Sequence, residues 1–377
     1  MLVVAKAGGW LHGPTKQTVI VRQSGLSGGT SAPIVAARPV LGNGFEPAQI
    51  YRRRAPGVVT IISFFAGPNG SAGQGSGFVV SAGGTILTSA HVITSADQGT
   101  TSTAPARQVY VEFGDGDRVG ARIVGYDLYD DVGVLRVDPE AHALAPVPLG
   151  DSRTLVVGQP VAAIGSPFGN ADSLSVGVIS AVRRSIPSLT SRYNLLDAIQ
   201  TDAPINHGNS GGPLFDARGR VIGINAQIRS SGSSSGFEGV GFAVPIDSAR
   251  RSLDQLERTG KVEYAYVGIK TEDLTPSLAR RLGYATTHGA LIDEVSAGSA
   301  GAKAGLEAGT HDVIYEGVDV RTGGDAIVAI DGIPVQRAED VVRIVTSLLP
   351  GEKATFTVVR GAKRRTVAVT LDRRPPG

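Results

Sequence analysis

The chain has 377 residues, a formal net charge of +2 and no cysteine. This length allows two domains with a full core each, and the lack of cysteine excludes disulfides, thiol nucleophiles and cysteine metal sites. The 51 glycines and an aromatic content of 5% favour short strands joined by tight turns over helical bundles. The arginines are dispersed, as in the pair Arg183-Arg184, which argues against a nucleic-acid-binding stripe.

Residues 1–48 are rich in Gly, Ser, Pro, Thr and Ala and predict a flexible N-terminal segment or linker. No run approaches the length of a membrane span. Residues 1–5 are too short for a signal-peptide core and would fit the trailing edge of a membrane anchor missing from this sequence.

Residues 49–260 show short apolar runs separated by turn residues. Strands are predicted at 58–65, 77–80, 85–90, 108–113, 118–126, 132–137, 160–164, 174–182, 219–228 and 240–244. Many short strands with regular turns indicate an antiparallel barrel or sandwich. A helix is predicted at 247–259, with Asp247 as its N-cap and Gly260 as its stop.

Residues 261–374 predict a second, smaller module. The expected strands lie at 266–271, 290–295, 326–330 and in a closing hairpin at 353–371. The expected helices lie between Thr275 and Gly283 and at 338–349, whereas residues 310–322 have no predicted structure. A small mixed sheet with two helices is typical of a binding module.

A glycine-rich turn surrounds Ser210 in the run 208–212, Gly-Asn-Ser-Gly-Gly. Glycine permits positive φ and close approach to the backbone, so that neighbouring N–H groups can converge where a tetrahedral oxyanion would form. Taken alone, the pattern is more often a surface turn. It also fits the nucleophile elbow of α/β-hydrolases, but Pro213 and the turn after it leave no place for the helix that the elbow requires.

A serine nucleophile needs a histidine base and an acid that orients the base. His91 ends one predicted strand and Asp131 precedes another, and each alone is more typical of an ordinary strand end. Their order, His91, Asp131, Ser210, is that of chymotrypsin-type enzymes and differs from the orders of subtilisins and α/β-hydrolases. Together they predict a catalytic triad.

These motifs resemble the HtrA (Deg) family of trypsin-fold serine proteases. The resemblance is carried by residues 88–91, 131–135 and 201–214 and extends from about residue 50 to residue 374. It implies a mainly β fold, with a chymotrypsin-like double β-barrel protease domain at 49–260 and a small α+β PDZ domain at 261–374. It also implies an ATP-independent serine endopeptidase that cleaves unfolded or damaged proteins in protein quality control.

The resemblance assigns His91 as general base, Asp131 as its orienting acid and Ser210 as nucleophile. The oxyanion hole would be formed at Gly208, Asn209 and Ser210. No ligand cluster appears, so no metal and no organic cofactor is expected. His207, where proline is frequent in the family, is interpreted as an exposed loop residue or as a source of pH sensitivity.

Specificity is predicted from the position six residues before Ser210, where trypsin-like enzymes that prefer basic side chains carry aspartate. Here this residue is Pro204, so a basic preference is not expected. The candidate walls of a small apolar pocket are Ile205, Ile224, Asn225 and Ala226. We therefore expect cleavage after Val, Ala or similar aliphatic residues.

The run Tyr266-Val267-Gly268-Ile269 resembles the carboxylate-binding loop of PDZ domains and would bind peptide C-termini. The family further implies a homotrimer and a bacterial envelope location, periplasmic or membrane-anchored. The alternative is a PDZ-bearing chaperone or binding protein with an idle protease module, because an oxyanion loop flipped into an inactive form would have the same sequence.

Overall fold

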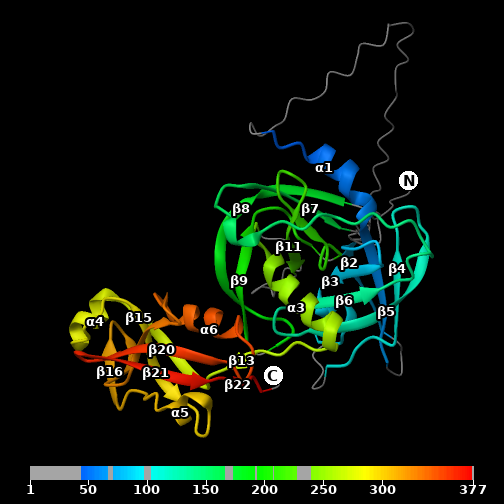
Figure 1. The fold of residues 1–377 in the computed structure, drawn as a ribbon. Coiled ribbons are helices and arrows are strands. Elements are labelled where there is room, and N and C mark those ends of the chain that lie inside the picture. Colours follow the sequence, from blue (N-terminus) through cyan, green and yellow to red (C-terminus); the bar gives the residue numbers. More distant parts are fainter. Residues whose placement is uncertain are drawn as a thin grey trace, which may run out of the picture. The chain divides into compact units, whose positions relative to one another are not determined.

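The structure is a computed structural model that describes residues 44–66, 71–96, 103–165, 173–191, 193–206, 208–226 and 239–375. Most of the predicted N-terminal linker and His207 lie outside these residues. Figure 1 shows the first barrel mainly in blue and cyan, the second in green and the C-terminal module in yellow to red.

The first barrel contains six antiparallel strands in the closed order β1-β2-β3-β6-β5-β4. Their bounds are β1 (Val58–Phe64), β2 (Ala72–Val79), β3 (Thr85–Thr88), β4 (Gln108–Glu112), β5 (Arg118–Asp127) and β6 (Val132–Arg136). Inward-facing apolar residues such as Ile61, Val111 and Leu135 are fully buried in its core. Closure leaves no free sheet edge.

The second barrel closes in the order β10-β11-β12-β9-β8-β7. Its strands are β7 (Pro160–Gly165), β8 (Ser173–Pro187), β9 (Asn194–Thr201), β10 (Pro213–Phe215), β11 (Val221–Ala226) and β12 (Gly241–Pro245). Phe78 of the first barrel and Phe215 of the second are both fully buried in one hydrophobic cluster. The predicted double barrel is therefore confirmed, and the sandwich alternative is wrong.

Short helices accompany the barrels. They are α1 (Pro47–Arg54), η1 (Ala55–Gly57), α2 (Ala90–Ile93), η2 (Ser152–Thr154) and α3 (Ile246–Thr259). Helix α3 ends at Gly260 with φ 70°, as predicted. The N-cap prediction is wrong, because Pro245 occupies that position and the Asp247 carboxylate instead accepts hydrogen bonds from Ser152 N and Oγ, both at 2.7 Å.

The C-terminal module contains a sheet in the order β14-β15-β18-β20-β21, with β19 beside β18. Its elements are β13 (Ala265–Tyr266), β14 (Ile269–Leu274), α4 (Pro276–Leu282), β15 (Gly289–Val295), α5 (Ala300–Ala304), β18 (Ala326–Ile330), β19 (Ile333–Pro334), α6 (Ala338–Thr346), β20 (Lys353–Arg360), β21 (Lys363–Thr370) and β22 (Asp372–Arg373). Thr275 caps α4 by accepting from Leu278 N, and Gly283 ends it, both as predicted. Helix α6 is shorter than its predicted span.

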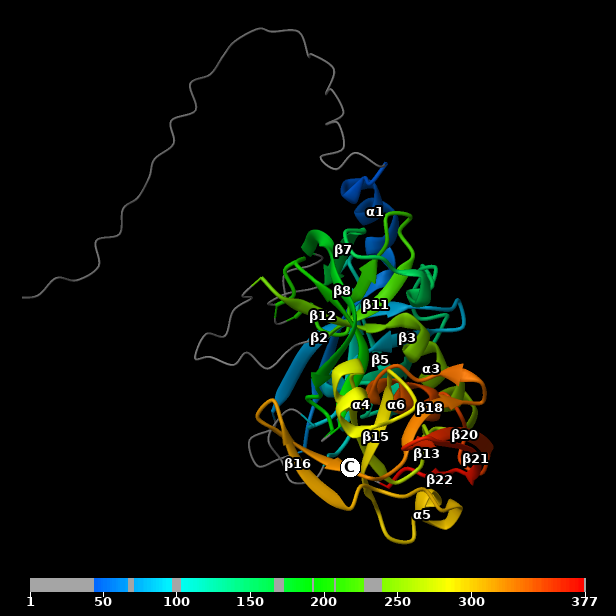
Figure 2. The same ribbon diagram turned by 90° about the vertical axis from the view of Figure 1, so that its left-hand side faces the viewer.

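Residues 310–322, unassigned from the sequence, form a two-stranded hairpin of β16 (His311–Tyr315) and β17 (Val318–Thr322). Its loop is Glu316-Gly317, with φ angles of 51° and 83°. Two consecutive positive φ values match a type I′ turn, which suits the twist of a hairpin. Figure 2 shows this hairpin in orange at the margin of the module.

Among the described residues, no helix combines the length and apolarity required to cross a membrane.

Candidate active site

His91 and Asp131 form a buried pair in the first barrel. His91 lies in α2, directly after β3, whereas the sequence predicted a strand end there. Its Nδ1 lies 2.7 Å from Asp131 Oδ2, and its backbone N–H donates to Asp131 Oδ1 at 3.0 Å. The two side chains are 4% and 8% exposed. Both carboxylate oxygens therefore contact the same histidine, which fixes the imidazole by its ring and by its backbone.

The backbone of Asp131 is constrained as well. Asp131 has φ 52°, in the left-handed region that L-residues rarely adopt, between β5 and β6. Its carbonyl accepts a hydrogen bond from Ala90 N at 3.2 Å, one residue before His91. Asp and Asn tolerate this conformation better than most side chains, so the turn delivers the carboxylate to α2 at small cost.

Ser210 lies in the turn before β10 of the second barrel and is 3% exposed. Its Oγ is buried and has no hydrogen-bond partner among the residues that the structure describes. The same holds for the backbone N–H groups of Gly208 and Ser210, for which no acceptor occurs in the described ranges. Donors left unpaired around one hydroxyl are what an oxyanion-binding site requires.

Asn209 lies between Gly208 and Ser210, and its side chain is buried. Its backbone N–H donates to Asn206 O at 3.0 Å and its Nδ2 to Pro204 O at 3.4 Å. Gly208 has φ 98° and Gly211 has φ 83°, so the turn needs glycine at both positions.

Ser76 on β2 connects the two barrels at this site. Its backbone N–H donates to Ser210 O at 2.8 Å, and its Oγ donates to Gly208 O at 2.5 Å. Its own carbonyl accepts from Thr88 Oγ1 at 2.7 Å, three residues before His91. The sequence analysis did not identify Ser76. The available signal was the run of glycines at 73, 75 and 77 inside a strand, which indicates close approach of another backbone.

Gly211 shows how tightly the serine turn packs against the histidine segment. A Cβ at this position would lie 2.3 Å from Ser76 O, 2.4 Å from Thr88 Oγ1 and 3.0 Å from Ser89 N. From the second barrel, Asn225 O accepts from Gly211 N at 2.8 Å. The structure thus brings the Ser210 turn against the segment that carries His91.

The four candidate pocket residues fall into separate environments. Ile224 and Ala226 on β11 are 0% and 5% exposed and pack in the cluster that contains Phe215. Asn225 is fully buried, and its Nδ2 donates to Pro213 O at 3.3 Å. Ile205 packs instead against the core of the second barrel, where a Cβ on Gly241 would lie 2.8 Å from it. The structure therefore does not join Ile205 and Ile224 in one apolar cluster.

The predicted peptide-binding loop lies between β13 and β14. Tyr266 and Ile269 are partly buried, and Val267 and Gly268 are buried. Gly268 has φ 77°, and its carbonyl accepts from Ser296 N at 2.8 Å. Strand β14 is a sheet edge in the described part of the chain, with only β15 paired to it.

Two further acids, Asp127 and Asp130, lie beside Asp131 in a buried polar cluster. Asp127 accepts from Ser252 Oγ at 2.7 Å and from Tyr264 OH at 2.5 Å. Burial raises the pKa of Asp127. Burial also raises the pKa of Asp130 to about 7, with the neighbouring Asp127 charge adding to the effect and Arg251 opposing it. Within the described ranges, no group of three or more metal-ligating side chains occurs.

Comparisons with protein families match both modules. A model described as a trypsin-like peptidase domain matches residues 75–224, and one described as a PDZ domain matches residues 265–371.

Comparisons with individual proteins agree. A probable periplasmic serine endoprotease, DegP-like, from Pseudomonas fulva is 36% identical over 352 residues, which are 93% of this chain and 65% of the relative. Protease Do-like 1, chloroplastic, from Arabidopsis thaliana is 40% identical over 305 residues, which are 80% of this chain and 64% of the relative. The chain thus spans less than two thirds of these relatives.

Among solved structures, the HtrA-type protease AlgW with tripeptide is similar with a TM-score of 0.73 and 32% identity. The match covers 88% of this chain and 98% of that one.

Proposed function

We propose that this chain, which belongs to the HtrA-type family of serine proteases, is an endopeptidase that cleaves unfolded or damaged proteins without ATP. The observation that carries the proposal is the buried pair in which His91 Nδ1 lies 2.7 Å from Asp131 Oδ2. The Ser210 turn packs against the segment that carries His91, and the Ser210 hydroxyl has no hydrogen-bond partner in the described part of the chain.

In the proposed reaction, Ser210 Oγ attacks the peptide carbonyl carbon and its proton passes to His91 Nε2. A C–O bond forms, and the carbonyl oxygen becomes an oxyanion that accepts from the N–H groups of Gly208 and Ser210. The intermediate collapses by breaking the C–N bond, and His91 returns the proton to the leaving amine. Water then attacks the acyl-enzyme with His91 again as base, the ester C–O bond breaks, and His91 returns the proton to Ser210 Oγ.

Asp131 acts by orientation and charge. Its Oδ2 accepts from His91 Nδ1, which fixes the tautomer whose Nε2 can receive the serine proton. The carboxylate also stabilises the imidazolium that forms during the reaction.

For specificity, we propose cleavage after small aliphatic residues. Pro204 supplies no carboxylate to attract a basic side chain. Ile205 contributes an apolar side chain beside Gly241. The remaining pocket candidates are the β11 residues Ile224, Asn225 and Ala226. Because these residues are at most 5% exposed, we propose that they contribute to the pocket through their backbone.

For the C-terminal module, we propose that a peptide C-terminus binds at Tyr266, Val267, Gly268 and Ile269. An extended peptide would add a strand to the edge of β14. Helix α6 is anchored beside this edge, because Asp273 on β14 accepts from Ala338 N at 2.7 Å at the start of the helix. The peptide would thus lie between the edge of β14 and helix α6.

We further propose a homotrimer and an extracytoplasmic location. The relatives named periplasmic endoproteases support the location, and family membership supports the assembly.

The test uses unfolded casein with the full chain, the Ser210→Ala variant and a Ser81→Ala control in a hairpin turn of the same molecule. Mass spectrometry of the fragments should show cleavage after Val or Ala by the wild type and the control, and none by Ser210→Ala. Cleavage after Arg or Lys would overturn the specificity but keep the mechanism. If no form cleaves, even with a hydrophobic C-terminal peptide that binds, the alternative of a PDZ-bearing binding protein is correct.

A further inference from the structure

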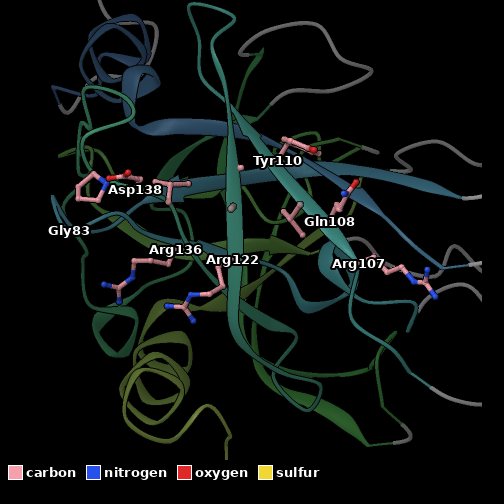
Figure 3. A pocket seen from close by; sticks show the side chains of 12 residues that line it. Gly83, Arg107, Gln108, Tyr110, Arg122, Arg136 and Asp138 are labelled. Atoms are coloured by element: carbon pink, nitrogen blue, oxygen red, sulfur yellow. The ribbon is translucent and has the colours of Figure 1, made fainter.

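A basic groove lies on the outer face of the first barrel, apart from every residue of the candidate active site. It has a volume of about 750 Å³ and is lined mainly by β4, β5 and the end of β6. Three of its lining residues are arginines, Arg107, Arg122 and Arg136. Figure 3 shows Arg122 and Arg136 projecting to the same side, with Tyr110 and Gln108 farther along and Arg107 at the other end.

Two of these arginines oppose each other across the sheet. Arg122 and Arg136 are register partners in the β5–β6 ladder, so that their side chains leave the same face of the barrel. Like charges directly opposite each other destabilise a sheet. Glu257 compensates Arg136 through an ion pair at 2.8 Å, but Arg122 is exposed and has no ion pair within the described ranges. An external anion would remove this repulsion.

Glycines in the lining of the groove leave space for a ligand. A Cβ on Gly120 would meet no atom within 4 Å, and one on Gly83 would meet only Ser81 Oγ at 3.7 Å. Tyr110 lies opposite Gly120 on β4 and offers an aromatic surface. Asp138 lines the groove near Gly83, and its carboxylate accepts from Glu140 N at 3.0 Å. Its negative charge repels an anion from that end of the groove, so that an anion would bind nearer Arg122.

The chemistry favours side-chain carboxylates of a polypeptide. The barrel is closed, so the backbone N–H groups of β4 and β5 are paired in the ladder and offer no cradle for a phosphate. The donors are guanidinium groups, whose planar fork binds carboxylates and phosphates alike. A polypeptide is therefore favoured by the lack of a backbone cradle in β4 and β5 and by the shape of the groove. The groove is open along its length, which suits an extended chain with more than one acidic residue.

We infer that this groove binds an acidic stretch of an extended polypeptide substrate and so holds that substrate on the enzyme outside the active site. The identity of the occupant as a substrate rests on the proposed function. A second contact on the same chain raises the effective concentration of the substrate at the active site without changing the chemical step. The groove therefore lowers KM for acidic substrates and leaves kcat unchanged.

Binding is measured with the full chain carrying Ser210→Ala, so that no turnover occurs. The probe is a fluorescein-labelled peptide of Glu, Ser and Gly with an amidated C-terminus, which removes the carboxylate that the PDZ module would bind. Fluorescence anisotropy at low salt (about 50 mM) should show saturable binding that weakens at higher salt. Arg122→Gln should weaken it by about fivefold to tenfold, and adding Arg107→Gln should weaken it further.

Arg118→Gln is the matched control, because Arg118 lies on the same strand outside the groove lining and is paired with Glu112 at 2.6 Å. Equal affinity in Arg122→Gln and Arg118→Gln, or no binding of the probe, would overturn the inference. A probe with Gln in place of Glu should not bind. Vesicles of phosphatidylglycerol and phosphatidylcholine in equal parts are tested in parallel. Binding to them that depends on Arg122, without peptide binding, would overturn the polypeptide occupant.

The same substitution in the active chain separates the two proposals. Arg122→Gln should raise KM for a cleavable peptide with an acidic stretch, with no change for its uncharged counterpart. If the wild type cleaves neither peptide but binds the probe through Arg122, the proposed function fails and the groove stands.

Discussion

The two barrels contribute unlike halves of the candidate active site. In the first barrel, both oxygens of Asp131 already accept hydrogen bonds from His91. In the second, the Ser210 hydroxyl and the N–H groups of Gly208 and Ser210 have no partner in the described part of the chain. The half that holds the proton carrier thus has its orienting carboxylate fully engaged, whereas the half that would meet new negative charge keeps its donors available.

The most damaging substitutions should remove the serine or its base. Ser210→Ala and His91→Ala should each lower kcat by about 10⁴–10⁶-fold, and the double variant should be no worse, because the two groups act as one unit. Rates on casein fragments at saturating substrate provide the measurement. Additive losses in the double variant would mean that the two halves act independently.

Removing only the negative charge of Asp131 should lower kcat less than removing Ser210 or His91. Asp131→Asn should lower kcat by about 10³–10⁴-fold while the fold is retained, since the amide can keep the geometry but stabilises the wrong imidazole tautomer. Circular dichroism serves as the folding control. A loss below about tenfold would show that Asp131 is not the orienting acid.

Gly211→Ala should disrupt the contact between the halves. The new Cβ would lie 2.3 Å from Ser76 O, and the backbone has φ 83°. We expect a kcat loss of roughly 10²-fold, because the serine turn must move away from the histidine segment. Gly116→Ala is the matched control, with φ 88° and no atom within 4 Å of the added Cβ. It should cost only about 1–2 kcal/mol of stability and leave the kcat unchanged. Equal kcat in the two variants would contradict this packing.

The smallest effect should come from the acids next to Asp131. Burial raises the pKa of Asp130 to about 7, above its value in an unfolded chain. The folded state therefore binds more protons than the unfolded state between about pH 4 and pH 7, and the free energy of unfolding falls as pH rises through this window. In the wild type, the free energy of unfolding should fall by an amount on the order of 2 kcal/mol between pH 5 and pH 8 because of Asp130, and this fall should be absent in Asp130→Asn. Urea unfolding curves at these pH values measure it, and an unchanged slope against pH would contradict it.

The sequence predicted the six strands of the first barrel, the order of the candidate triad and the family, because alternation, turn residues and chain order are local or easily counted. In the second barrel it did not predict β9 and β10. It did not predict that His91 lies in a helical turn, since four residues are too few for a periodic signal. The hairpin at 311–322 was missed because Glu316-Gly317 is a weaker turn signal than Asn-Gly or Asp-Gly. Ser76 was missed because its role depends on contacts between the two barrels, more than 130 residues apart in the chain.

The most direct test of the central claim is covalent labelling with a fluorophosphonate, which reacts only with a serine activated by a base. Peptide mass spectrometry should locate one adduct on Ser210 in the wild type and none in His91→Ala. Labelling of Ser210 that is equally fast in both forms, or labelling confined to other serines, would contradict the proposal that the two barrels assemble one catalytic site.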